Sequence, residues 1–213
     1  GVLLSTFQNR RWDSDFLTVQ AILHEGWLGK LYHIQSSVTS YGHISGWRAK
    51  RELMGGWLYD WGAHTLDQIL QLESSRPLHV YAFAHARSDE MDAVEDYIHC
   101  TVTFESGLTA TTVIGFLNKI EMPRWYIFGE DGTLQADDFQ KPVRVKTKLN
   151  SIDTELSVPL IKGDWKDYYT NIAEVLKGKA ELIVKPEQLV PQIAIAEAAY
   201  RSIEKKQVAR VEY

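Results

Sequence analysis

The spacing of one aspartate and one histidine offers the clearest chemistry in this sequence. Asp60 and His64 lie four positions apart within Trp57 to Leu72, a segment whose hydrophobic pattern predicts a helix. Side chains four residues apart emerge on the same face of a helix, so the carboxylate and the imidazole can act together. A carboxylate beside an imidazole fixes its tautomer and raises its basicity, and histidine exchanges protons near neutral pH. The spacing therefore predicts an acid–base pair.

Three other interpretations of these residues remain open. An aspartate and a histidine at this spacing also form surface ion pairs, which contribute under about 1 kcal/mol to stability. Asp60 near a helix N-terminus would simply favour the helix dipole. A metal site using Asp60, His64 and Asp67 is the other hypothesis, although the sequence supplies no further ligands at the spacing of known metal motifs.

Adjacent arginine and tryptophan residues occur twice in the sequence. Arg11 adjoins Trp12, and Trp47 adjoins Arg48 within a glycine-containing segment that predicts a long loop. Sugar rings stack on tryptophan faces and accept hydrogen bonds from arginine, so both pairs are candidate substrate contacts. An arginine folded over a tryptophan for structural reasons is an equally good interpretation.

Several functions are excluded by motifs that the sequence lacks. The sequence contains no Gly-x-Gly pair and no Gly-Lys-Ser/Thr, so it has neither a dinucleotide-binding fingerprint nor a P-loop. It also has no Gly-x-Ser-x-Gly and no His-Glu-x-x-His motif. The single cysteine, Cys100, falls on the apolar side of an alternating segment, which predicts a buried structural thiol rather than a nucleophile.

The composition argues against nucleic acid and membranes as partners. The 213 residues carry 23 Lys and Arg against 28 Asp and Glu, a formal net charge of −5, so no cationic field is expected to attract phosphate or anionic lipid. No apolar run approaches the roughly 20 residues needed to span a bilayer. One cysteine fits a reducing compartment, and we expect a cytoplasmic location.

Hydrophobic periodicity predicts the elements that must position these side chains. The expected helices cover 14–25, 57–72, 165–177 and 186–205. The expected strands cover 31–40, 78–86, 96–104, 108–116, 125–128, 133–136 and 143–148, with short strands at 2–4 and 208–211. Because strands outnumber helices and mostly follow one another, we expect an α+β fold with a large, predominantly antiparallel open sheet and helices packed on one face. No linker interrupts the pattern, so residues 1–213 are expected to form a single domain.

Four motifs follow one another along the chain: Asn9 to Phe16, Gly26-x-x-Gly29, Gly55-Gly56 through Asp60-x-x-x-His64-x-x-Asp67-Gln68, and Asp164-x-x-x-Tyr168-Tyr169-x-Asn171-Ile172. Together they resemble the C-terminal domain of the glucose-fructose oxidoreductase/inositol dehydrogenase/rhizopine catabolism (Gfo/Idh/MocA) family. The resemblance spans nearly the whole chain, and the first motif is similar to that of the NADP-dependent scyllo-inositol dehydrogenase group.

The resemblance implies an enzyme that oxidises a sugar or polyol hydroxyl, inositol-like, by hydride transfer to NAD or NADP. Carried onto this sequence, it makes His64 the general base and Asp60 its partner and a substrate ligand. Arg11, Trp12 and Tyr169 fall where the family motifs lie near the substrate pocket, although Tyr168 and Tyr169 by themselves are more typical of core and rim aromatics.

The resemblance also implies what this chain lacks. In the family an N-terminal Rossmann domain holds the cofactor, and a lysine from its Glu-Lys-Pro motif joins the Asp-x-x-x-His pair. This sequence contains neither that motif nor Gly-x-Gly-x-x-Gly. We therefore expect an absent Rossmann domain, no cofactor or metal bound to this chain, and no activity of the chain alone.

Alternation also predicts an unusual sheet surface. His79, Tyr81, His85, Tyr97 and His99 share one face of neighbouring predicted strands, and this face is more aromatic than a solvent-exposed surface normally is. A subunit interface suits it, and with the family's habit of association it implies a homodimer or homotetramer through the open sheet face.

The beginning of the chain separates two hypotheses. Residue 1 is Gly rather than Met, and an apolar stretch from Val2 to Leu4 starts at once, which suggests that further sequence is encoded upstream. The alternative to an enzyme fragment is a stand-alone, non-catalytic binding or assembly module with the same fold. An initiator Met directly before Gly1 would favour the module.

Overall fold

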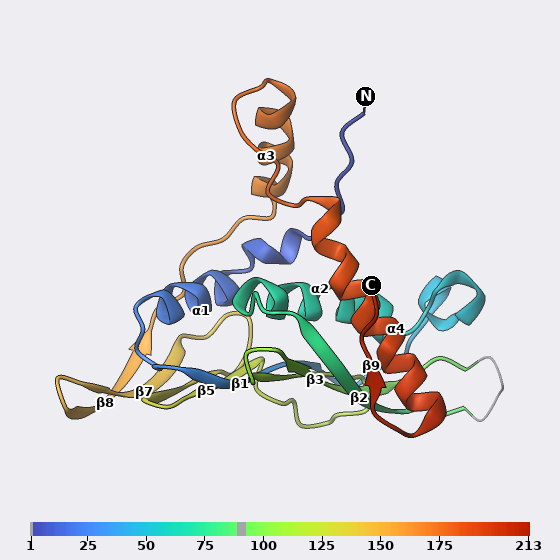
Figure 1. The fold of residues 1–213 in the computed structure, drawn as a ribbon, viewed down its shortest axis with the longest axis horizontal. Helices are drawn as coiled ribbons and strands as arrows, with labels where there is room; N and C mark the ends of the chain where they lie inside the picture. Colours follow the sequence, from blue (N-terminus) through green and yellow to red (C-terminus); the bar gives the residue numbers. More distant parts are fainter. Residues whose placement is uncertain (1, 89–92) are drawn as a thin grey trace.

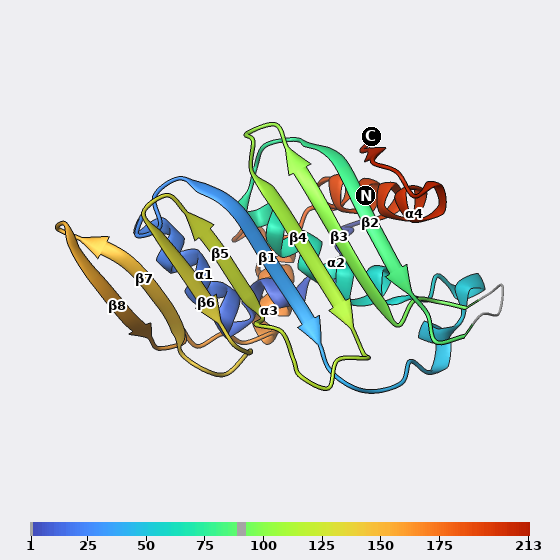
Figure 2. The same ribbon diagram turned by 90° about the horizontal axis from the view of Figure 1, so that it is seen from below.

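One large sheet with helices on a single face dominates the structure, a computed structural model that describes residues 2–88 and 93–213. The strand order in the described residues is β8-β7-β6-β5-β1-β4-β3-β2-β9. Helices α1, α2 and α4 cover one face, α3 projects beyond them, and the other face is open (Figures 1 and 2). This arrangement confirms the predicted α+β fold. Gly1, where the sequence suggests an interrupted start, lies outside the described residues.

The elements have the following bounds. The strands are β1 (Leu31–Thr39), β2 (Pro77–His85), β3 (Tyr97–Phe104), β4 (Thr109–Gly115), β5 (Trp125–Gly129), β6 (Gly132–Ala136), β7 (Val143–Leu149), β8 (Ile152–Val158) and β9 (Ala209–Arg210). The α-helices are α1 (Ser14–His24), α2 (Trp57–Leu72), α3 (Lys166–Leu176) and α4 (Leu189–Lys205). Short 3-10 helices are η1 (Asn9–Trp12), η2 (Gly46–Ala49), η3 (Arg51–Leu53) and η4 (Pro186–Gln188).

The pairing of β1 with β4 places α2 over the middle of the sheet. Neighbouring strands in the described sheet are antiparallel except for this pair, which is parallel from His33 opposite Thr109 to Thr39 opposite Gly115. Parallel neighbours need a long crossover connection. The connection here includes α2, which packs on β4 and β1. The element that carries Asp60 and His64 is therefore fixed by the topology.

Alternation along β3 separates the core from the open face. Ile98, Cys100, Val102 and Phe104 are buried beneath the helices, while the residues between them are half-buried on the other face. Cys100 is unpaired and fully buried, and burial raises the pKa of its thiol to about 12. The prediction of a buried structural thiol is confirmed.

A glycine lets α2 lie close to the sheet. A Cβ placed at Gly62 would lie 2.8 Å from Leu58 Cδ1 and 3.4 Å from Ile114 Cδ1 on β4. The same side of the helix buries Leu66 and Ile69. Because these residues face the sheet, the side chains of α2 that carry the proposed chemistry face away from it.

Two features of the fold differ from the sequence predictions. The strand expected at 2–4 is wrong, because residues 2–8 have no regular secondary structure and lie on the helix side of the molecule, away from any strand edge (Figure 1). Conversely, β8 was not predicted. Its apolar residues Ile152, Leu156 and Val158 alternate with polar ones, but none of its residues is buried.

No helix in the described part of the chain is long and apolar enough to cross a membrane.

Candidate functional site

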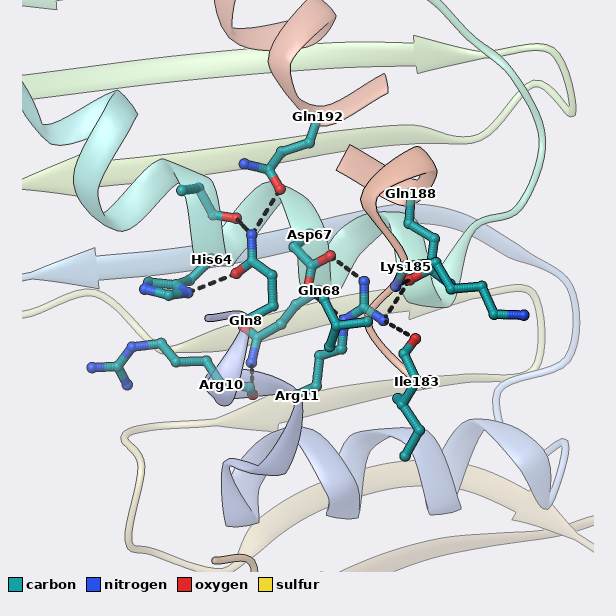
Figure 3. Close-up of polar contacts among 12 residues, drawn as sticks. Gln8, Arg10, Arg11, His64, Asp67, Gln68, Ile183, Lys185, Gln188 and Gln192 are labelled. Carbon is teal, nitrogen blue, oxygen red and sulfur yellow. Dashed lines mark hydrogen bonds and ion pairs between the residues drawn. The ribbon is translucent and has the colours of Figure 1, made fainter. Parts of the chain in front are cut away.

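The side of α2 that faces away from the sheet meets the segment that leads into η1. Asp60 and His64 are partly exposed on this side, as the helical spacing predicts. Gln8, just before η1, lies against His64 (Figure 3). Residues about 56 positions apart in sequence therefore form one polar cluster above the sheet.

His64 is held by an amide rather than by a carboxylate. Its Nδ1 lies 2.9 Å from Gln8 Oε1. The pKa of His64 is lowered to about 4, first by burial and then by the charge of Arg10, while the charge of Asp60 acts in the opposite direction. The imidazole is consequently neutral at pH 7.

Asp60 is paired with an arginine of the preceding loop. Its Oδ2 accepts a hydrogen bond from Arg48 Nε at 2.7 Å, and the Arg48 guanidinium lies 4.6 Å from the centre of the Trp47 ring. The structure therefore brings together three predicted site residues, Trp47, Arg48 and Asp60. Asp60 acts on His64 through its charge, whereas the hydrogen-bond partner of the imidazole is Gln8.

The guanidinium of Arg11 is hydrogen-bonded within the protein. Its Nε and Nη2 donate to the two carboxylate oxygens of Asp67 at 2.8 and 2.6 Å. Its Nη1 donates to the Ile183 carbonyl at 3.3 Å and to Gln188 Oε1 at 3.0 Å (Figure 3). Arg11 is 7% exposed. This geometry makes Arg11 a brace between η1, α2 and the segment before α4.

Trp12 and Tyr169 belong to an aromatic cluster beside the site. Trp12 lies edge-on to Tyr168, with ring centres 6.0 Å apart, and Tyr168 is similarly edge-on to Tyr169. Tyr169 is 59% exposed and also contacts Phe7 at 5.4 Å between ring centres. The Tyr169 hydroxyphenyl group is therefore accessible, whereas Trp12 is partly covered.

Arg10 and Trp61 are site residues that the sequence analysis did not single out. The Arg10 guanidinium lies 3.9 Å from the Trp61 ring centre and 5.1 Å from that of Trp165, and its Nη1 donates to Asp13 Oδ2 at 3.1 Å. One signal could have found Trp61, since it lies three positions before His64 on the same helical face. Arg10 lies in the first family motif, but that motif does not indicate that Arg10 makes cation–π contacts.

The described residues do not fit a metal ion. They contain no group of three or more His, Cys, Asp and Glu side chains arranged to hold one. Asp67, the third ligand in the metal hypothesis, instead has both carboxylate oxygens bonded to Arg11.

The glycine-rich turn before α2 does not fit the pyrophosphate of a dinucleotide. Backbone N–H groups at a helix N-terminus after glycines are the usual cradle for such a group. Here the Glu95 carboxylate already accepts a hydrogen bond from Leu58 N–H at 2.9 Å. A Cβ at Gly56 would lie 2.8 Å from both Glu95 oxygens, so an internal carboxylate occupies this space.

Comparison with known proteins places this geometry in a family. The family model described as the GFO/IDH/MocA C-terminal domain matches residues 16–135. The chain belongs to this family. Among Gfo/Idh/MocA relatives, the scyllo-inositol 2-dehydrogenase (NADP(+)) IolW of Bacillus subtilis is 32% identical over 238 residues, which cover 100% of this chain and 66% of that protein.

Other Gfo/Idh/MocA proteins agree with this assignment. The 1,5-anhydro-D-fructose reductase of Ensifer adhaerens is 26% identical over 220 residues, covering 100% of this chain and 65% of that enzyme. The crystal structure of an NAD-binding protein from Listeria innocua has a TM-score of 0.87 at 28% identity, covering 97% of this chain and 66% of that one. The chain thus spans just under two thirds of the length of these relatives.

Proposed function

We propose that this chain is the substrate-binding and catalytic part of an NAD(P)-dependent oxidoreductase that acts on a sugar or polyol hydroxyl, inositol-like. The observation that carries the proposal is a neutral His64 on the same helical face as the Asp60–Arg48–Trp47 group. The family assignment and the relatives named for inositol and anhydrofructose chemistry support it.

His64 is the general base of the proposed reaction. Its Nδ1 is bonded to Gln8, so its Nε2 is the atom that accepts the proton of the substrate hydroxyl. The nicotinamide cofactor supplies the hydride acceptor when it is bound. Because the pKa of His64 lies well below 7, the imidazole is present in its proton-accepting form at neutral pH.

Asp60, Arg48 and Trp47 form the substrate-binding group. The Arg48 side chain is 42% exposed, and among the described residues it donates only to Asp60, so its other donors are available for hydroxyl oxygens. Asp60 offers a carboxylate to hydroxyl donors, and Trp47, 45% exposed, offers a ring face on which a sugar can stack. A polyhydroxylated ring matches this mixture of donor, acceptor and apolar face.

The remaining predicted residues act around this group. Tyr169 is accessible and belongs to the rim of the proposed pocket, with Trp12 packed behind it through Tyr168. Arg11 contributes to substrate binding by bracing α2 through Asp67.

In our proposal the cofactor-binding site lies outside this chain. The described helix N-terminus after two glycines is filled by Glu95, and the sequence has no Gly-x-Gly. We propose that residues 1–213 are one domain, that a Rossmann domain precedes them, and that the chain alone is inactive. Calorimetric titration of the chain with NAD or NADP should show no tight binding; a Kd below about 10 µM would contradict this.

The decisive experiment removes the base from the full-length protein. His64→Ala should lower kcat by about two to four orders of magnitude, the usual contribution of a general base. His24→Ala, at the exposed end of α1, is the matched control and should leave kcat unchanged. Near-normal turnover in His64→Ala would refute the assignment.

The open face of the sheet is the proposed contact between subunits. Tyr81 and Phe83 are each 47% exposed on β2, and Phe83 stacks on His99 of β3 with ring centres 4.8 Å apart. A contiguous aromatic surface of this kind is typical of an interface. Tyr81→Glu should convert the homodimer or homotetramer into a smaller species in sedimentation velocity; an unchanged sedimentation coefficient would place the contact elsewhere.

A further inference from the structure

Gln8 makes three hydrogen bonds that together determine how its amide is oriented. It is 5% exposed and lies between α2 and α4. Its Nε2 donates to the Ala63 carbonyl oxygen at 3.1 Å and to Gln192 Oε1 at 2.9 Å. Its Oε1 faces His64 Nδ1 at 2.9 Å (Figure 3).

The Ala63 carbonyl removes the ambiguity that amide side chains usually have. A glutamine rotated by 180° exchanges its oxygen and nitrogen, and Gln192 can rotate in the same way to compensate. A backbone carbonyl is only an acceptor and cannot rotate, so the Gln8 atom that faces Ala63 must be the NH₂ group. The Gln8 oxygen therefore faces His64.

The orientation of Gln8 dictates which imidazole nitrogen carries the proton. An amide oxygen can only accept, so His64 Nδ1 must donate and must carry the hydrogen. A neutral imidazole has one hydrogen, which leaves the lone pair on Nε2. No hydrogen bond from Nε2 to another side chain occurs among the described residues around it.

We propose that Gln8 is a positioning residue that holds His64 in the Nδ1–H tautomer, with Nε2 free to accept a proton from the substrate. The use of Nε2 rests on the proposed function above, whereas the tautomer itself does not. Gln8 touches His64 and not the reacting hydroxyl, so its effect on the reaction passes through the imidazole.

An amide serves this purpose differently from the carboxylate found beside many catalytic histidines. The charged groups that act on His64 are Arg10 from η1, Asp60 from its own helix and Arg124 just before β5, while the residue from α4, Gln192, is neutral. A neutral acceptor fixes the tautomer without adding negative charge that would favour the imidazolium. The pKa of His64, about 4, is therefore set by burial and by the charges of Arg10, Asp60 and Arg124.

The first test reads the tautomer directly in the full-length protein. Long-range ¹H–¹⁵N spectra of protein with ¹⁵N-labelled histidine, with His64 assigned by loss of its signals in His64→Gln, should show a protonated Nδ1 and an unprotonated Nε2 at pH 7. Wild-type protein with a protonated Nε2 would overturn the proposal whatever the variants do.

The second test removes the acceptor. Gln8→Met keeps the length of the side chain but has no amide, so His64 should shift toward the Nε2–H form, and kcat should fall about 10- to 100-fold with KM little changed. Gln207→Met, at an exposed position after α4, is the control and should change neither. An unchanged His64 tautomer in Gln8→Met would refute the role of Gln8.

The third test keeps the acceptor and changes its charge. Gln8→Glu should retain the Nδ1–H form while raising the pKa of His64 by about 1–3 units, because a carboxylate favours the imidazolium. The acid limb of the kcat/KM profile should move upward with it. A carboxylate at position 8 that leaves both the pKa and this limb unmoved would contradict the proposed contact.

These results separate the two proposals. If His64→Ala keeps normal turnover but the tautomer responds to Gln8→Met, the proposed function fails and the positioning contact stands. If His64→Ala abolishes turnover but the tautomer of His64 is unchanged in Gln8→Met, His64 remains the base and the role of Gln8 is refuted.

Discussion

Helix α2 carries two aspartate–arginine pairs, two helical turns apart, that differ in almost every physical respect. Asp67 and Arg11 are joined by two hydrogen bonds of 2.6 and 2.8 Å, and their side chains are 2% and 6% exposed. Asp60 and Arg48 share a single bond of 2.7 Å, and their side chains are 19% and 42% exposed. The same pairing of residue types therefore exists once inside the protein and once at its surface.

The difference in burial assigns the two pairs different roles. Removing one partner of a buried pair leaves a charge without water or a counter-ion, which is costly, whereas water replaces a lost partner at the surface. Asp67 and Arg11 consequently cannot exchange partners without destabilising the fold. Asp60 and Arg48 can exchange partners, so a substrate hydroxyl can take part in their contact.

The largest effect should come from breaking the buried pair. Asp67→Asn keeps the shape of the side chain but leaves the Arg11 charge uncompensated, so the free energy of unfolding should fall by about 3–5 kcal/mol. Urea denaturation at pH 7 measures the loss. Asp60→Asn is the matched variant on the same helix and should change stability by less than about 1 kcal/mol. Equal losses in the two variants would show that burial does not distinguish the pairs.

A second test uses pH and the neutral His64 that lies between the two pairs along α2. Its folded-state pKa of about 4 lies below the unperturbed 6.5, so between these values the unfolded chain binds a proton that the folded chain does not. Stability should therefore fall as the pH decreases from 6.5 toward 4, with a contribution from His64 of up to about 3 kcal/mol.

His64→Gln isolates this contribution, because it removes the titrating group while the carboxylates that also respond in this range are retained. The free energy of unfolding, measured by urea denaturation at several pH values, should depend less steeply on pH in the variant. Identical slopes would mean that folding does not lower the pKa of His64.

Most of the fold is predictable because burial imposes periodicity on the sequence. The β2–β3–β4 meander and α2 follow directly from alternating and helical patterns, since one face of each packs on the core. β8 alternates apolar and polar residues, but none of its residues is buried, so burial does not mark it as clearly as the inner strands. Residues 2–4 are apolar but lie away from any strand edge, so they form no strand. The sequence alone does not show that a partner strand is absent there.

The candidate site is predictable only where its residues share one helix. The four-residue spacing places Asp60 and His64 on a common face, and the family motif indicates their chemistry. The partners of these residues come from distant segments, Gln8 for the imidazole and Arg48 for the carboxylate, so no spacing rule pairs them. Arg11 shows that a motif has its own limit. The motif identifies Arg11, but it does not show that the Arg11 guanidinium is hydrogen-bonded to Asp67.

The exposed pair can be tested through substrate binding in the full-length protein. Arg48→Ala should raise KM for a polyol substrate about tenfold, which corresponds to the loss of about 1.4 kcal/mol of binding, because one charged donor to a hydroxyl is removed. Steady-state kinetics with kcat measured separately gives the comparison. Arg144→Ala, at an exposed position of β7, is the control. Unchanged KM in Arg48→Ala would remove Arg48 from the proposed substrate group.

The smallest effect should be the coupling between Asp60 and Arg48 in the protein without substrate. A double-mutant cycle of Asp60→Asn and Arg48→Ala, measured by urea denaturation, should give a coupling free energy of about 0.2–1 kcal/mol, because both charges remain in contact with water. A weak coupling is what allows a substrate to compete for either partner. A coupling of about 3 kcal/mol or more would make this pair as structural as the Asp67–Arg11 pair, and Asp60 would then be unable to serve as a substrate ligand.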